Sequence, residues 1–132
     1  MTIVTSSRKP VPEVRSLCRD IAFSLGAECV ARGKLNFDAV KAADETVLVV
    51  SRADSGYRLE VIHGGATVAE YIVPSFRVTE RAGPIERGLF VANRAVFDEL
   101  APYIPVSYTG EENCTIRFAG TQRRQYLLEV LG

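Results

Sequence analysis

The sequence has few of the residues from which catalytic and metal sites are built. It contains a single histidine, so neither a histidine-based catalytic triad nor a two-histidine metal site is indicated. Its three cysteines, Cys18, Cys29 and Cys114, are odd in number and lack Cys-x-x-Cys spacing. This argues against a zinc site or a disulfide framework, and it favours small core residues in a reducing compartment. We therefore expect no catalytic residues, no cofactor and no metal site, and the protein is not predicted to be an enzyme.

Long apolar runs and net charge are absent as well. No basic segment followed by an apolar stretch opens the chain, and no run is long enough to span a bilayer. We expect a cytoplasmic protein without membrane contact. Sixteen Lys and Arg balance sixteen Asp and Glu. A chain without net charge lacks the usual signature of a nucleic-acid-binding protein, so such a function would depend on local charge.

The composition that remains is that of one globular domain. The chain has 132 residues, of which 47% are hydrophobic and 24% charged. These values exclude a disordered or collagen-like chain, and the length leaves no room for a second independent core. We predict a single domain over residues 1–132, with an N-terminal half of about 1–82 and a C-terminal half of about 83–132.

Strands and helices alternate in the first half. Residues 3–4 predict a short strand, and a helix follows from Pro12 to the stop signal Gly26. Residues 28–31 predict a second strand, and Asn36 is suited to cap a second helix. The apolar stripe of the first helix consists of Val14, Leu17, Cys18, Ile21, Ala22 and Leu25. The second helix would bury Phe37, Val40 and Ala43.

The remaining pattern predicts a mixed sheet. Residues 46–50 are apolar and β-branched without alternation, which indicates a strand covered on both faces at the centre of a partly parallel sheet. Residues 89–94 echo residues 2–8, since both segments read as an apolar strand, a small polar turn and an arginine. The fold class is therefore α/β, a mixed sheet with helices in two related halves. The other predicted elements are strands at 57–62, 66–73, 88–92, 115–119 and 125–131 and a helix capped by Asn93.

Positive charge is concentrated at the start of the chain. Residues 1–41 carry a net charge of +3, and the remainder carries −3. If the strands at 3–5 and 28–31 run parallel, the loops that follow them meet at one edge of the sheet, where ligands of open sheets bind. Hydroxyl groups, backbone N–H groups and arginines gathered there are suited to phosphate. The candidate phosphate-binding residues are Ser6, Ser7, Arg8, Lys9, Arg15, Arg32, Gly33 and Lys34.

A family resemblance rests on the same residues. The run Ile3-Val4-Thr5-Ser6-Ser7-Arg8-Lys9-Pro10, followed by Arg15, an amphipathic helix and Val30-Ala31-Arg32-Gly33-Lys34, resembles the Brix domain of ribosome-biogenesis proteins, in particular the compact archaeal type. The resemblance is closest over residues 1–52. It implies two anticodon-binding-domain-like halves and a protein that binds ribosomal RNA or its precursors during subunit assembly and processing. Other ribosome-assembly proteins would be further partners, and the eight candidates would be RNA-binding residues.

Two other functions remain open. Asp54-Ser55-Gly56 is similar to the Asp-Ser/Thr-Gly signature of dimeric aspartic proteases, in which two carboxylates share a proton. Residues 51–53 interrupt the apolar approach that such a site needs, and Asp-Ser-Gly also forms turns well. A protein-interaction adaptor without RNA contact is the second alternative, because the chain is neutral and residues 71–76 could lie exposed. Steep loss of affinity with salt would distinguish an RNA-binding protein from an adaptor.

Overall fold

A computed structural model describes residues 2–6, 11–30, 45–110 and 114–131 of the chain. The helix predicted after Asn36 lies outside these residues. The predicted α/β class with a mixed sheet is confirmed. The described residues form β1 (Thr2–Ser6), α1 (Pro12–Leu25), β2 (Glu28–Cys29), β3 (Thr46–Ala53), β4 (Gly56–His63), β5 (Ala66–Glu80), β6 (Leu89–Val91), α3 (Arg94–Leu100), β7 (Val106–Tyr108), β8 (Ile116–Ala119) and β9 (Arg124–Leu131).

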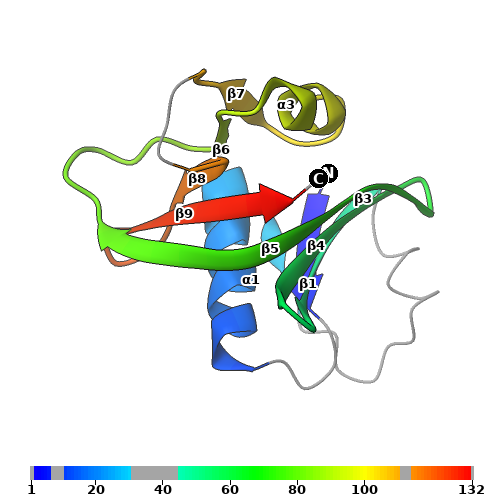
Figure 1. Cartoon of the computed structure of the whole chain (residues 1–132), viewed down its shortest axis with the longest axis horizontal. Helices are drawn as coiled ribbons and strands as arrows, with labels where there is room; N and C mark the ends of the chain where they lie inside the picture. The colour runs from blue at the N-terminus through cyan, green and yellow to red at the C-terminus, as the bar shows by residue number, and fades with distance from the viewer. Residues whose placement is uncertain (1, 7–10, 31–44, 111–113, 132) are drawn as a thin grey trace.

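All of these strands belong to one curled sheet, in the order β2-β1-β3-β4-β5-β9-β8-β6-β7 (Figure 1). β1 runs parallel to β2 and β3, and β6 runs parallel to β7. The remaining neighbours are antiparallel. Each edge of the sheet therefore carries a strand-helix-strand unit, β1-α1-β2 at one edge and β6-α3-β7 at the other.

α1 packs its apolar stripe on the sheet, and β5 and β9 cross in front of it in Figure 1. Pro12 supplies a favourable first-turn residue, and Gly26 ends the helix in the left-handed conformation with φ 67°. The predicted stripe is buried from Val14 to Ala22, and Leu25 is half-buried. The same core includes Phe118 of β8, so α1 packs against strands from both ends of the sheet order.

β5 corrects two predictions about the sheet. The strand predicted at 46–50 is β3, which is buried on both faces as expected but lies third in the order, whereas β5 occupies the centre. β5 also runs on past residue 73 to Glu80 and pairs first with β4 and then with β9. Pro74 does not end the strand because it sits where the register shifts between Ile72 and Ser75, and an irregularity of this kind tolerates a missing N–H.

The C-terminal half contains one strand that the sequence did not predict. α3 begins as expected, because the Asn93 side chain accepts hydrogen bonds from the backbone N–H groups of Ala95 and Val96. β7 follows directly after Pro105 and is three residues long. A strand so short, placed at the edge of the sheet, has little local pattern, and it is defined by its parallel pairing with β6.

Candidate nucleic-acid interface

β1 and β2 end at the same edge of the sheet. Their parallel pairing aligns Val4 with Cys29. Val30 continues the pairing, since its backbone N–H donates to the Val4 carbonyl at 2.9 Å, and the Thr5 hydroxyl donates to the Val30 carbonyl at 2.7 Å. The parallel arrangement on which the predicted phosphate site depends is therefore observed.

The structure describes two of the eight predicted RNA-binding residues. Ser6 ends β1 and is 8% exposed, so little of it is open to a ligand. Arg15 is exposed in the first half of α1. The convergence of the other six, which lie outside the described residues, stays a prediction. They are Ser7, Arg8, Lys9, Arg32, Gly33 and Lys34.

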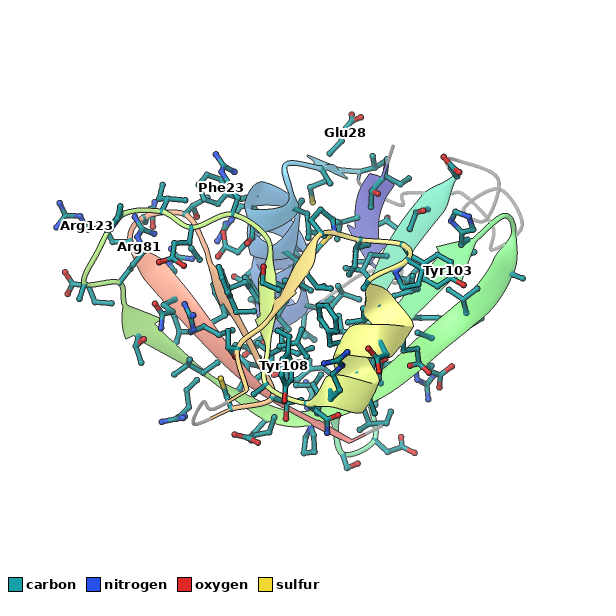
Figure 2. The ribbon with its side chains drawn as sticks, turned by 90° about the horizontal axis from the view of Figure 1, so that it is seen from above. Phe23, Glu28, Arg81, Tyr103, Tyr108 and Arg123 are labelled. Carbon is teal, nitrogen blue, oxygen red and sulfur yellow. The ribbon has the colours of Figure 1, made fainter. Side chains whose placement is uncertain are left out.

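A second concentration of positive charge lies beside α1, where the sequence analysis placed none. It comes from α1, the segment between β5 and β6, and the turn between β8 and β9. The Arg81 backbone N–H donates to the Arg123 carbonyl at 2.6 Å, and Figure 2 shows these two residues side by side. We call this group the arginine surface, and it consists of Arg19, Arg81, Arg87, Arg123 and Arg124.

The buried side chain of Asp20 joins α1 to the β8–β9 turn. It is 0% exposed, and its Oδ1 accepts hydrogen bonds from the Thr121 backbone N–H at 3.2 Å and the Thr121 hydroxyl at 2.8 Å. Its Oδ2 accepts from the Tyr126 hydroxyl. Arg19 and Arg124 approach the same carboxylate at 3.4 Å and 3.7 Å. A buried carboxylate persists only when it is paired and hydrogen-bonded, so Asp20 fixes two of the arginines in place.

The protonation states of this cluster follow from its hydrogen bonds. Burial alone raises the pKa of the Asp20 carboxyl, but the hydrogen bonds from Tyr126 and Thr121 favour the charged form more strongly and hold that pKa below its usual range. Burial and then the bond to Asp20 raise the pKa of Tyr126 to about 12. At neutral pH the pair is a carboxylate and a neutral phenol.

The turn itself requires unusual backbone geometry. A Cβ at Gly120 would lie 2.7 Å from the Tyr126 ring and 2.9 Å from the carboxyl carbon of Asp20, so only glycine permits this approach. Gln122 and Arg123 have φ values of 56° and 60°, which suit a two-residue hairpin turn of the I′ type. Figure 2 shows the Arg123 side chain extending away from the body of the protein.

Backbone carbonyls hold two further arginines without neutralising them. Nε of Arg81 donates to the Gly83 carbonyl at 3.0 Å. Nη1 of Arg87 donates to the Phe23 carbonyl, and its guanidinium lies 4.4 Å from the centre of the Phe23 ring. Within the described parts of the chain, Asp20 is the one acid paired with the arginine surface. The surface therefore keeps a positive charge, and side-chain contacts hold all of its arginines except Arg123.

Comparison with solved structures identifies the fold. Mil, an archaeal Imp4-like protein, superposes with a TM-score of 0.65 at 17% sequence identity, over 98% of this chain and 97% of Mil. The chain has the fold of the Imp4-like proteins. A probable ribosomal biogenesis protein from Aeropyrum pernix K1 superposes with a TM-score of 0.58 at 17% identity, over 98% of this chain and 94% of that chain. Both neighbours are of the Brix type, so the resemblance seen in the sequence is confirmed at the level of the fold. No protein-family model and no curated protein matches the sequence.

The aromatic residues of this Imp4-like fold are mostly in the core. The expectation that residues 71–76 lie exposed holds only for Pro74 and Ser75: Tyr71 is 3% exposed, and the Phe76 ring packs between Tyr57 and Tyr126, at 5.2 Å and 6.0 Å between ring centres. Tyr108 is an exception at 45% exposure, and its ring lies 5.4 Å from the guanidinium of Arg94. The two aromatic side chains of the segment invoked for an adaptor are therefore buried or half-buried.

Other candidate sites have ordinary surroundings. Asp54 is exposed in the turn between β3 and β4, which is the turn the sequence predicts. In the ranges that the structure covers, no group of three His, Cys, Asp or Glu side chains is placed to hold a metal ion. Neither of the two helices described is long and apolar enough to cross a membrane.

The arginine surface had only a faint signal in the sequence. The sequence places Arg123 in the turn between the strands predicted at 115–119 and 125–131, but nothing local connects that turn with α1. Asp20 is 101 residues from Thr121, and a lone acid beside an apolar helical stripe is ordinarily read as solvent-facing. In the folded protein Asp20 is buried and links α1 to the β8–β9 turn.

Proposed function

We propose that the protein is a non-catalytic RNA-binding factor of ribosome biogenesis, which binds ribosomal RNA or its precursors during subunit assembly and processing. The observation that carries the proposal is an arginine surface joined through buried Asp20, on a fold that matches, over nearly its full length, a protein described as a probable ribosomal biogenesis protein. The sequence resemblance to the Brix domain over residues 1–52 supports the same function.

Arginine is suited to this task because its planar guanidinium binds phosphate oxygens with two parallel hydrogen bonds. The Arg19 side chain is 50% exposed although it contacts Asp20, and Arg123 is exposed at the tip of its turn. Both have donors left for a ligand. Contacts of this kind position an RNA backbone without reading its sequence.

Arg15 connects the arginine surface with the predicted loop site. It lies one turn before Arg19 on α1 and is exposed. α1 starts near the edge at which β1 ends, because only residues 7–11 separate the two elements. We infer one track for the RNA backbone, from the loops after β1 and β2, along α1, to the β8–β9 turn.

The neutral chain limits non-specific affinity. Glu80 and Glu86 are exposed and flank Arg81 and Arg87 along the chain, so the track is bordered by negative charge. Affinity for a polyanion scales with the number of phosphates neutralised, and here that number is set by the track alone. Binding should therefore be moderate, salt-sensitive and confined to one face.

Filter binding of the full chain to a ribosomal RNA transcript tests the proposal. The variant Arg15→Ala/Arg123→Ala removes two arginines that have no carboxylate partner among the described residues. We expect about tenfold weaker binding near 0.1 M salt and a fall in the log–log salt slope of about 0.7 to 0.9 per lost contact. Arg8→Ala/Arg32→Ala tests the other end of the track in the same way.

The matched control is Arg58→Ala/Arg94→Ala. It changes the net charge equally, but these arginines are already paired with Glu70 at 3.4 Å and Asp98 at 3.0 Å. We expect RNA affinity close to that of the wild type. Equal losses in the track and control variants would contradict a defined track, and wild-type binding that is insensitive to salt would indicate an adaptor instead.

A further inference from the structure

Two cysteines that the sequence gave no reason to pair lie in contact. Sγ of Cys18 on α1 is 3.3 Å from Sγ of Cys29 on β2. Cys18 is 3% exposed, whereas Cys29 is exposed. Both are free thiols in the structure, and a third thiol, Cys114, is buried in the C-terminal half.

The local fold creates this contact. Gly26 reverses the chain in the left-handed conformation, and the backbone N–H of Ala27 bonds back to the Ala22 carbonyl at 2.9 Å. Among the described strands, β2 pairs with β1 alone and forms the edge of the sheet. Figure 2 shows Glu28 of β2 extending outward from the body. Cys29 is the next residue in this strand, and its thiol meets the helix.

We propose that Cys18 and Cys29 form an oxidation site, at which a peroxide converts the two thiols into an intramolecular disulfide that fastens the edge strand β2 to α1. The S–S bond of a disulfide is about 2.05 Å long, so the sulfur atoms need to approach by about 1.3 Å from their separation of 3.3 Å. β2 is two residues long and lies at the edge, where such a shift meets little resistance.

The two thiols take different roles in the oxidation because Cys29 is exposed and Cys18 is buried. The Cys29 thiolate attacks the peroxide, the O–O bond breaks, and Cys29 becomes a sulfenic acid while water or an alcohol leaves. The Cys18 sulfur then attacks the Cys29 sulfur, Cys18 loses its proton, and the sulfenic oxygen leaves as water. The two sulfurs give up two electrons in total, and the peroxide takes them up.

The order of these steps follows from burial. Desolvation, and then the contact with Cys29, raise the pKa of Cys18, so this thiol stays protonated and does not meet the oxidant first. Exposed Cys29 does. Cys18 is the resolving thiol, and its attack is the slower step, which accelerates with increasing pH.

Mass spectrometry of the full chain tests the proposal. The native protein is treated with hydrogen peroxide, denatured without reductant, alkylated and digested with trypsin. We expect the wild type to take up one alkyl group, on Cys114, in place of three. The tryptic peptides 16–19 and 20–32 should appear joined by a disulfide. The melting temperature should rise by several degrees on oxidation and return after reduction.

Single variants separate this pair from general oxidation. Cys114→Ala should still form the link, and Cys18→Ser should stop at a sulfenic acid on Cys29, trapped by a dione reagent. In Cys29→Ser, Cys18 should remain a thiol that alkylates only after denaturation. Three alkylated cysteines in the oxidised wild type would overturn the proposal. A covalent dimer through Cys29 on a non-reducing gel, without the internal link, would do so as well.

Discussion

The two edges of the sheet carry the same strand-helix-strand unit, but their helices are attached to the opposite half in different ways. α1 reaches the β8–β9 turn through the fully buried carboxylate of Asp20. α3 reaches β5 through Glu99, an exposed residue that accepts a hydrogen bond from the Tyr71 hydroxyl. A buried charge is expensive to leave unpaired, whereas an exposed one can turn to water. α1 is therefore attached through a buried charge network, whereas α3 is attached through an exposed hydrogen bond and the apolar packing of Val96 and Leu100.

Removing the anchor of α1 should give the largest effect. In Asp20→Ala the Tyr126 hydroxyl and the Thr121 donors lose their acceptor, and Arg19 and Arg124 lose the carboxylate between them. We expect the free energy of unfolding to fall by about 3 to 5 kcal/mol in a urea titration, because a buried network keeps its desolvation cost when one partner is removed.

Asp98→Ala is the surface control, because it removes an exposed acid of α3 whose ion pair lies within the helix itself. Asp98 forms a surface ion pair with Arg94 at 3.0 Å, and both side chains are at least 60% exposed. Such pairs one helical turn apart contribute only about 0.3 to 0.5 kcal/mol. If the two substitutions cost the same, the large contribution assigned to the buried Asp20 network would be wrong.

Removing one hydroxyl group, from Tyr126 or from Tyr71, compares the two helix attachments by a smaller change. Tyr126→Phe keeps the ring, which stacks on Phe118 at 4.8 Å, and removes the hydroxyl that donates to buried Asp20. We expect a loss of about 1.5 to 3 kcal/mol, as for a hydrogen bond to a charged group. Tyr71→Phe should cost about 1 kcal/mol or less, because Glu99 regains water. Thermal or urea unfolding of both variants at neutral pH measures the difference.

The pH dependence of stability follows from the same bond. The pKa of Tyr126 is raised from 10.0 to about 12 in the folded protein, so its contribution is present below pH 10 and is lost as the pH rises toward 12. The Asp20 pKa is lowered, so its contribution is lost as the pH falls through the folded value, below 3.8. Tyr126→Phe should therefore lose less stability than the wild type between pH 10 and 12. An identical alkaline profile would contradict the assignment.

Local signals were sufficient for much of the fold. The apolar stripe from Val14 to Leu25 and the stop at Gly26 predict α1 to the residue, and Asn93 predicts the start of α3. The predicted strand at 66–73 stops short of Glu80, and the irregularity that accommodates Pro74 within β5 depends on pairing with β9. The central position of β5 likewise depends on contacts between distant segments.

The candidate site was less predictable than the fold. The parallel edge of β1 and β2 was expected, since a strand-helix-strand crossover requires it. The burial of Asp20 was not, because its donors are supplied by a hairpin about a hundred residues away. The Cys18–Cys29 contact was missed for a related reason: eleven residues separate the pair, and the chain reversal at Gly26 brings them together.

A modest effect is expected at the start of α3, where the Asn93 side chain caps the helix. This helix has seven residues, too few to be stable alone, and the Asn93 side chain satisfies two of its first backbone N–H groups at 2.9 Å and 3.2 Å. Asn93→Ala should therefore cost about 1 kcal/mol and speed hydrogen exchange at Ala95 and Val96, whereas Asn93→Asp should retain the cap. α1 starts after Val11 without a side-chain cap, so its stability comes from packing and from Asp20. Unchanged exchange in Asn93→Ala would show that packing against the sheet, as in α1, also holds the first turn of α3.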